Sequence, residues 1–274
     1  MDYIETSKGL KIPKIGLGTA GIGGGRIPDK KKDAYFIESI RYALESGYSL
    51  IDTAEIYGGG HTEEIIGEAI EPYDRGSLFI ITKVSGEHLK YDQILEAMER
   101  SHRRLRTHYV DLYLIHWPSE MVPIRESMRA MELLVEQGKT RFIGVSNFNK
   151  KQMDEANSSL ISHEIVANEV HYSLSHHEPE KEIIPYCQSN DIVLISYSPL
   201  EKGELTRVHD DEFYKMMKKY GKTEAQISLN WLISQKNVTA IPKSTNHKHL
   251  MENLGSIGWR LEDIDANLLR KLKV

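Results

Sequence analysis

The regular alternation of short apolar runs with longer amphipathic segments constrains the fold of this chain more than any other feature of its sequence. Seven runs are rich in β-branched and aromatic residues, as buried strands are. These runs are residues 48–52, 78–82, 110–115, 142–145, 165–168, 192–197 and 238–241. Five of the intervening segments repeat their apolar residues with helical spacing. These segments are residues 33–46, 93–105, 124–137, 181–189 and 223–234.

The number of repeating units indicates the architecture. A further short strand at residues 15–18 brings the total to eight, and alternating strands and helices imply a parallel sheet. Eight such units in 274 residues fit a (β/α)₈ TIM barrel, with an open doubly wound sheet as the alternative. Residues 3–12 predict an N-terminal β-hairpin and residues 261–273 a C-terminal closing helix. We expect residues 1–274 to form a single domain of class α/β.

The first glycine-rich loop contains a G-x-G-x-x-G pattern at Gly16, Gly18 and Gly21. That pattern binds a dinucleotide when it follows a strand, opens a helix and precedes an acidic residue by about 20 positions. Here more glycines and a proline follow, where no helix would form, and Arg41 occupies the acidic position. The pattern therefore predicts a loop, and the binding of a dinucleotide has to be argued from other residues.

Charge and cysteine content exclude several classes of protein. The net charge is −5, which argues against binding to nucleic acid or to acidic membranes. We expect the basic clusters around Arg103, Arg104 and Arg106 and around Lys215, Lys218 and Lys219 to be solvated helix faces. The single cysteine, Cys187, excludes an internal disulfide and predicts a packing residue in a reducing compartment. Without an apolar run of membrane length or a signal-peptide pattern, we expect a cytoplasmic protein, with a monomer favoured and the oligomeric state open.

Reactive residues of a barrel lie at the carboxyl ends of its strands. In this chain those ends carry Asp52, Lys83 and His116, and Tyr57 follows Asp52 by five residues. A lysine ammonium lowers the pKa of a neighbouring tyrosine, a carboxylate stabilises the buried ammonium, and a histidine can orient a carbonyl oxygen. Together, these four residues suit acid catalysis on a carbonyl. They do not suit a metal site, because Asp, Lys and His are a poor combination of metal ligands. Because something else must then deliver a hydride, the chemistry implies a reduced nicotinamide cofactor.

The sequence resembles the aldo-keto reductase family over nearly its whole length, in motifs that occur in the family's order and spacing. They are GLGT at residues 16–19, DTAEIYG at 52–58, TK at 82–83, IHWP at 115–118, AMELLVEQGKTRFIGVSNF at 130–148, YSPL at 197–200 and IPKS at 241–244. The resemblance implies a (β/α)₈ barrel that reduces aldehydes and ketones reversibly with NADPH, or NADH, and without a metal. It also implies that Asp52, Tyr57, Lys83 and His116 form the catalytic tetrad.

The resemblance assigns contacts along the cofactor. Gly18 and Thr19 would lie near the nicotinamide, Ser146, Asn147 and Glu169 would contact its carboxamide, and Tyr197 would stack on the ring. The remaining contacts would run toward the adenosine end. They are Ser198 and Leu200 at the pyrophosphate, Lys243, Ser244, Thr245 and His249 at the ribose or its 2′-phosphate, and Glu252 and Asn253 at the adenine. Tyr57, His116 and Trp117 would contact a small carbonyl substrate.

Three departures from the family pattern affect these expectations. Glu169 stands where the family usually has Gln, so it could accept from the carboxamide but not donate, and its charge could alter nicotinamide affinity. His249 stands where most members have an Arg, which weakens the case for strict use of NADPH. The chain ends at Val274, soon after its last helix, and Ser85 is small where many members have Trp. We therefore expect an open pocket with Tyr57 and Trp117 as its main aromatic walls.

Two other classes of function compete with a carbonyl reductase. A non-catalytic or redox-sensing barrel would bind the cofactor and act through a protein partner, but an intact tetrad argues against it. A hydrolase could use His171, His176 and His177, which lack an accompanying ligand pattern and which we expect on the surface.

Overall fold

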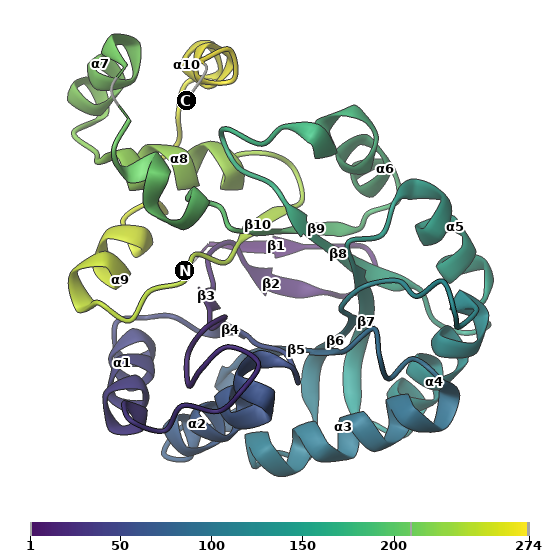
Figure 1. The fold of residues 1–274 in the computed structure, drawn as a ribbon. Helices are drawn as coiled ribbons and strands as arrows, with labels where there is room; N and C mark the ends of the chain where they lie inside the picture. Colours follow the sequence, from purple (N-terminus) through teal and green to yellow (C-terminus); the bar gives the residue numbers. More distant parts are fainter. Residues whose placement is uncertain (1, 209, 273–274) are drawn as a thin grey trace.

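Eight parallel strands form a closed barrel in the computed structural model, which describes residues 2–208 and 210–272 (Figure 1). Neighbours in the chain are neighbours in the sheet. The strands are β3 (Leu17–Gly18), β4 (Leu50–Asp52), β5 (Phe79–Val84), β6 (Val110–Ile115), β7 (Thr140–Ser146), β8 (Ile165–His171), β9 (Val193–Tyr197) and β10 (Val238–Ala240). The first and last strands close the ring, because Gly16 N donates to Ala240 O at 2.9 Å and Gly18 N donates to Pro242 O at 3.2 Å. The predicted (β/α)₈ barrel is confirmed.

Gly16 and Gly18 of the G-x-G-x-x-G pattern belong to this closure. A Cβ atom on Gly16 would lie 2.5 Å from the side chain of Leu50, and one on Gly18 would lie 2.6 Å from the backbone oxygen of Ile241. Because real Cβ atoms do not come so close, only glycine lets β3 pass between its neighbours. Packing of the barrel therefore explains Gly16 and Gly18, whereas Gly21 has a positive φ in the loop that follows. No helix follows the pattern before α1.

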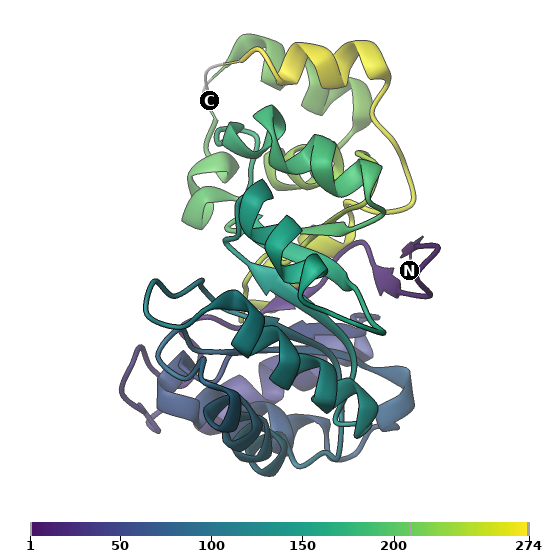
Figure 2. The ribbon, with the colours of Figure 1, turned by 90° about the vertical axis from the view of Figure 1, so that its right-hand side faces the viewer.

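Helices follow the strands and surround the barrel (Figure 1). Those that follow the successive barrel strands are α1 (Asp33–Glu45), α2 (His61–Ile70), α3 (Tyr91–Leu105), α4 (Ile124–Glu136), α5 (Lys150–Ser158), α6 (Ile183–Ser189), α8 (Glu224–Ile233) and α9 (His247–Leu254). Two more helices, α7 (Asp211–Tyr220) and α10 (Asp263–Leu269), lie outside this ring near α8 (Figures 1 and 2). Trp231 of α8 ties α10 to the barrel, since its Nε1 donates to Ala266 O at 3.0 Å.

The N-terminal hairpin plugs one end of the barrel. Its strands, β1 (Tyr3–Glu5) and β2 (Lys11–Pro13), pair in antiparallel fashion as predicted. Ile4, Leu10 and Ile12 pack into the same apolar cluster as interior residues of the barrel strands. Lys8 Nζ donates to the oxygen of Ile165, the first residue of β8, at 3.3 Å. The hairpin therefore lies at the amino ends of the strands (Figure 2) and leaves the carboxyl ends open.

Several expectations about the elements need correction. The helices α2, α5, α7 and α9 were not predicted, and the segment 181–189 begins its helix only at Ile183, after the short 3₁₀ turn Glu178–Lys181 (η3). Strands β5, β7 and β8 extend beyond their predicted ends, because parallel neighbours supply their hydrogen bonds. The closing helix is shorter than residues 261–273, and Lys273 lies outside the described residues.

The basic cluster of α3 is also not a solvated face throughout. Arg104 makes a 2.6 Å ion pair with Glu63, whose side chain is fully buried in α2. Glu63 also accepts a 2.6 Å hydrogen bond from the Thr82 hydroxyl. On α7, Lys219 pairs with Glu262 and Asp265, each at 2.8 Å. Cys187 is buried as expected, and burial raises the pKa of its thiol to about 12, so it is an inert packing residue.

Candidate active site

A cavity of about 1190 Å³ opens at the carboxyl ends of the barrel strands, opposite the hairpin. It is larger than the ~300–1,000 Å³ typical of small-molecule pockets, so it has room for more than a small substrate. Nearly all of the predicted site residues line it. They are Gly18, Thr19, Asp52, Tyr57, His116, Trp117, Ser146, Asn147, Glu169, Tyr197, Ser198, Leu200, Lys243, Ser244, His249, Glu252 and Asn253. Lys83 lies beneath the floor with no exposed surface.

A buried cluster of charges forms the floor of the cavity. Lys83 Nζ donates to Asp52 Oδ1 at 2.6 Å and to the backbone oxygen of Thr53 at 3.0 Å. Glu169 Oε2 lies 3.3 Å from the same ammonium. The three side chains come from strands β5, β4 and β8, and none is more than 3% exposed. One ammonium therefore faces two carboxyl groups away from water.

Tyr57 stands directly above this cluster. It opens the 3₁₀ segment η1 (Tyr57–Gly60), in which Gly58, Gly59 and Gly60 all have positive φ. These three glycines turn the chain sharply between β4 and α2, which brings the ring over the barrel mouth. Lys83 Nζ lies 5.4 Å from the centroid of the Tyr57 ring, and the ring meets His116 edge-on with centroids 5.7 Å apart.

Burial dominates the electrostatics of Tyr57. It raises the pKa of the Tyr57 hydroxyl, and the charge of Lys83 opposes only part of that rise. The expected net lowering by the neighbouring ammonium therefore does not occur in this structure. Burial disfavours the ammonium of Lys83, but the attraction of its acidic neighbours, above all Asp52, outweighs that cost and raises the pKa of Lys83. Tyr57 is thus a protonated phenol beside a permanent cation.

His116 is a neutral imidazole at the edge of the same site. Burial, together with the charge of Lys83, lowers the pKa of His116 to about 3. Its Nδ1 atom is buried and has no hydrogen-bond partner among the described residues. A neutral imidazole carries one N–H and one acceptor nitrogen, so His116 can offer one hydrogen bond to a ligand without a charge.

The next strands supply amide and hydroxyl groups on the opposite wall. Asn147 has a left-handed backbone (φ 60°) at the end of β7, a strained conformation that is concentrated at functional sites. Its Nδ2 donates to His116 O at 3.1 Å and to Ser146 Oγ at 2.9 Å. The Tyr197 hydroxyl donates to Asn147 Oδ1 at 3.0 Å. This network fixes the Tyr197 ring and Asn147 against the backbone of His116.

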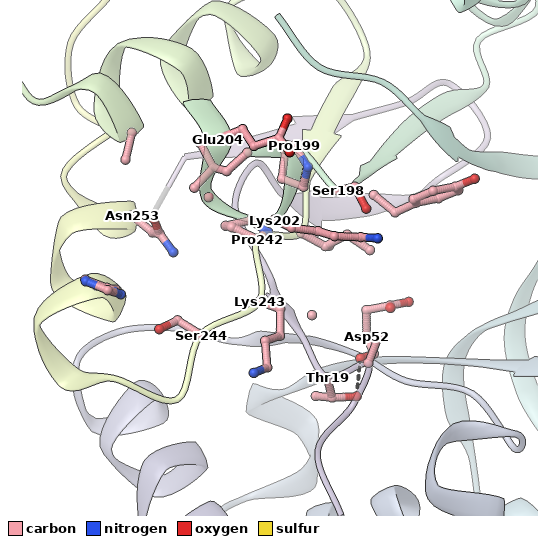
Figure 3. Close-up of a pocket in the computed structure, with 18 of the residues that line it drawn as sticks. Thr19, Asp52, Ser198, Pro199, Lys202, Glu204, Pro242, Lys243, Ser244 and Asn253 are labelled. Carbon is pink, nitrogen blue, oxygen red and sulfur yellow. Dashed lines mark hydrogen bonds between the residues drawn. The ribbon is translucent and has the colours of Figure 1, made fainter. Parts of the chain in front are cut away.

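The far end of the cavity lies between the loop after β10 and helix α9. Figure 3 shows Ser244 and Asn253 on this side, Thr19 hydrogen-bonded to Asp52 on the other, and Lys243 of the loop after β10 between them. Lys243 is exposed, whereas Ser244 and Asn253 are buried. Thr245 is not among the lining residues, because its carbonyl turns away to accept hydrogen bonds from Tyr35 and Ser39. Its predicted contact with the cofactor stays a prediction.

From the sequence, only Ser198 and Leu200 were predicted in the loop after β9, which provides one wall of the cavity. Its residues, in and beside the 3₁₀ segment η4 (Glu201–Thr206), include two cations, Lys202 and Arg207. Ser198, Glu201 and Lys202 all have positive φ, so this loop follows an irregular path that no sequence pattern predicts. The sequence did contain a signal for this wall: Lys202 and Arg207 follow shortly after the YSPL motif.

The three histidines proposed for a hydrolase are partly exposed and stacked on neighbouring rings. His171 stacks between His176, at 4.1 Å, and the Tyr197 ring, at 5.5 Å, while His177 stacks on Trp231. His171 Nε2 lies 2.7 Å from Glu201 Oε1. No group of three or more His, Cys, Asp or Glu side chains within residues 2–208 and 210–272 is arranged to hold a metal.

Comparison with known proteins gives a consistent result. The family model described as "Aldo/keto reductase family" matches residues 14–273. The chain is 31% identical to the methylglyoxal reductase YeaE of Escherichia coli, over 98% of this chain and 93% of that protein. A crystal structure of a thermostable aldo-keto reductase in complex with the inhibitor epalrestat superposes with a TM-score of 0.95 and 43% identity, covering 98% of this chain and 99% of that one. An aldo-keto reductase from Klebsiella pneumoniae in complex with NADPH has a TM-score of 0.88 and 30% identity, covering 100% and 97%.

Proposed function

Because this chain belongs to the aldo/keto reductase family, we propose that its cavity reduces small aldehydes and ketones with Tyr57 as the general acid. The chain is an NAD(P)H-dependent oxidoreductase that acts on carbonyl groups. Relatives of this kind are named as reductases, so nothing favours the alternative of a non-catalytic barrel. The observation that carries the proposal is the stacking of Tyr57 over the buried Lys83–Asp52 pair, with His116 beside it.

The residues have separate roles in the proposed reaction. Tyr57 keeps its proton because burial raises the pKa of its hydroxyl, and it gives that proton to the carbonyl oxygen. Lys83 stabilises the phenolate that remains, and Asp52 holds Lys83 in place through the 2.6 Å ion pair. We assign the hydrogen of the neutral His116 ring to Nε2, because the buried Nδ1 has no acceptor. His116 then orients the substrate oxygen without competing as an acid.

The residues around the cavity fit a nicotinamide cofactor. The cavity is large enough for such a cofactor. The Tyr197 ring and the polar wall at Asn147 suit its nicotinamide end. Its phosphate-bearing end is suited by Lys243, Ser244 and His249. When bound, the reduced cofactor would supply a hydride to the carbonyl carbon. The protein's part is to hold Tyr57, His116 and the carbonyl in one orientation, which is worth a large fraction of the barrier.

We propose that the substrates are short carbonyl compounds of the methylglyoxal type. A relative at 31% identity is named as a methylglyoxal reductase. The substrate end of the cavity is open at Trp117, which is about half exposed, at 51%. Ser85 is buried and does not line the cavity, so its small size does not widen the pocket as expected. Such a site rejects few small carbonyls and binds each weakly, because selectivity requires enclosing walls. High selectivity for one bulky ketone would contradict this proposal.

We also propose the surroundings in which the enzyme works. No helix within the described residues could cross a membrane. The negative net charge supports an enzyme that does not bind nucleic acid, and the sequence favours a monomer in the cytoplasm. Light scattering of the purified protein measures the oligomeric state.

Replacement of Tyr57 by Phe tests the proposed acid. We expect Tyr57→Phe to lower kcat for methylglyoxal by about 10²–10⁴-fold, the usual contribution of general acid catalysis. The dissociation constant of NADPH, measured by quenching of tryptophan fluorescence, should stay nearly unchanged. Tyr214→Phe is the matched control, because Tyr214 lies exposed on α7, outside the cavity. If Tyr57→Phe keeps more than about a tenth of the wild-type turnover, Tyr57 is not the acid.

A further inference from the structure

The Lys83 site contains one acidic group more than its cation can neutralise. Asp52 and Glu169 both lie within salt-bridge distance of Lys83 Nζ, at 2.6 Å and 3.3 Å. Glu169 Oε2 is buried and makes no hydrogen bond within the described part of the chain. A buried carboxylate without a counter-ion is very costly, and such a group takes up a proton instead.

The distances decide which carboxyl group holds the extra proton. Asp52 is closer to Lys83 and accepts a hydrogen bond from it, so its ionised form is the better stabilised. Burial and the neighbouring Asp52 raise the pKa of Glu169 well above its ordinary value, and the attraction of Lys83 compensates only in part. Four ionisable side chains interact electrostatically with Glu169, and Lys83 is the one cation among them. They are Asp52 of β4, Tyr57 of η1, Lys83 of β5 and Tyr197 of β9.

We propose that Glu169 is a neutral acid at physiological pH and that its titration controls both the acid strength of Tyr57 and the preference of the cavity for reduced cofactor. Glu169 is a positioning residue in this proposal, and the proposal rests on the function given above. With Glu169 neutral, Asp52, Lys83 and Glu169 sum to zero charge. With Glu169 ionised, the same three groups carry one net negative charge directly beneath the cavity.

The first consequence concerns Tyr57. A negative charge on Glu169 disfavours the Tyr57 phenolate and therefore raises the pKa of Tyr57 further. Tyr57 then becomes a weaker acid, so reduction should decline as the pH rises and Glu169 loses its proton. The protonated Glu169 corrects the expectation from the sequence, because a neutral carboxylic acid can both accept and donate a hydrogen bond. At neutral pH, Glu169 can therefore both donate and accept hydrogen bonds, as the amide of a Gln at the same position would.

The second consequence concerns the cofactor. Glu169 lines the cavity and pairs in register with Ser146, and its backbone oxygen accepts from Asn147 N at 2.8 Å. The oxidised nicotinamide ring carries a positive charge and the reduced ring carries none. An ionised Glu169 therefore strengthens the binding of NADP⁺ relative to NADPH, and a neutral Glu169 does not.

An infrared titration tests the protonation state without cofactor or substrate. We expect the wild-type protein to show, at neutral pH, the carbonyl band of a protonated carboxylic acid, which shifts in D₂O and disappears in alkaline buffer. The band should be missing from Glu169→Gln. It should be present in Glu201→Gln, because the Glu201 carboxyl group pairs with His171 and not with Lys83. Absence of the band from the wild type at neutral pH would overturn the proposal, whatever the protein reduces. A clear band in a protein that reduces no aldehyde counts instead against the proposed function.

Cofactor binding provides the second test. The dissociation constants of NADP⁺ and NADPH are measured by fluorescence quenching from mildly acidic to mildly alkaline buffer. In the wild type and in Glu201→Gln, the ratio of the NADP⁺ constant to the NADPH constant should fall by about fivefold to tenfold as the pH rises, the difference between a neutral and a charge-assisted contact. In Glu169→Gln the ratio should stay constant, and the alkaline decline of kcat for reduction should shift or disappear. An equal change of the ratio in Glu169→Gln and the wild type would refute a role for Glu169.

Discussion

His116 shows at the scale of a single residue how burial sets function and stability together. Its pKa, lowered to about 3, keeps the ring neutral throughout the range in which the enzyme would work. The same burial has a cost in acid, because an unfolded chain can protonate this histidine near its ordinary pKa of 6.5 while the folded protein cannot. The unfolded state then binds more protons than the folded state, so stability falls as the pH drops below about 6.5.

This linkage gives a measurable prediction for His116→Gln. Between pH 7 and pH 5, His116 should remove about 2 kcal/mol from the free energy of unfolding of the wild type. The variant lacks the titrating group, so its stability should fall by about that much less over the same interval. Urea denaturation at the two pH values measures the difference. His163→Gln, which changes a half-buried histidine outside the cavity, serves as the comparison. Equal acid sensitivity of the wild type and His116→Gln would show that His116 titrates normally.

The types of residue at strand ends were enough to predict which side chains meet in the site, but not their protonation. Asp52, Lys83 and His116 each follow a recognisable strand, and parallel strands bring such ends to one edge. The state of Glu169 depends on two distances to Lys83, 2.6 Å and 3.3 Å, and on burial. Neither quantity is readable from a sequence. Arg104 was misread for the same reason, because its buried partner Glu63 lies on another helix.

Two of the helices that were missed, α5 and α9, have recognisable N-terminal ends. Helix α5 begins with a capping box, in which Asn149 accepts from Gln152 N and Gln152 returns the bond, and α9 begins at Asn246, whose side chain accepts from Lys248 N. These are local N-terminal signals that periodicity alone overlooks. The ends of strands β7 and β8 could not be predicted, since their last hydrogen bonds come from neighbouring strands.

Packing between α2 and α3 gives a prediction at the scale of elements. Gly67 lies inside α2, where an Ala would raise helix propensity by about 1 kcal/mol. However, a Cβ atom there would lie 2.3 Å from the backbone oxygen of Arg104 in α3. Because backbone cannot move away as a side chain can, Gly67→Ala should destabilise the protein by about 1–3 kcal/mol in spite of its better propensity.

Thermal or urea denaturation measures this effect. Gly25→Ala is the matched control, since nothing lies within 4 Å of its added Cβ and its φ is not positive. It should change stability by no more than about 0.5 kcal/mol. If Gly67→Ala is as stable as Gly25→Ala, the two helices are not held at the close approach seen here.

Over the whole molecule, the residues that stabilise the barrel and the residues that form the site lie at opposite ends of the strands. The hairpin and the apolar interior occupy the amino ends of the strands, and polar, strained residues such as Asn147 and Ser198 gather at the carboxyl ends. The count of alternating units predicted this arrangement well. That residues 1–274 form one domain stays a prediction, which a single cooperative unfolding transition would support.

The last prediction concerns the end of the cavity that would bind the 2′-phosphate of the cofactor, away from the reacting residues. Lys243 lines that far end and supplies a positive charge, and His249 stands on α9 where a second cation would strengthen it. A charge-assisted hydrogen bond contributes about 1.5–3 kcal/mol, so each such contact changes the preference for NADPH over NADH by about tenfold to a hundredfold. We therefore expect the wild type to prefer NADPH, His249→Arg to widen that preference and Lys243→Ala to nearly abolish it. The measurement is kcat/KM for both cofactors with one aldehyde, with Lys150→Ala, on the exposed start of α5, as the control. If Lys243→Ala retains the full preference, the phosphate is read elsewhere along the cavity, and Lys202 and Arg207 of the loop after β9 are the next residues to replace.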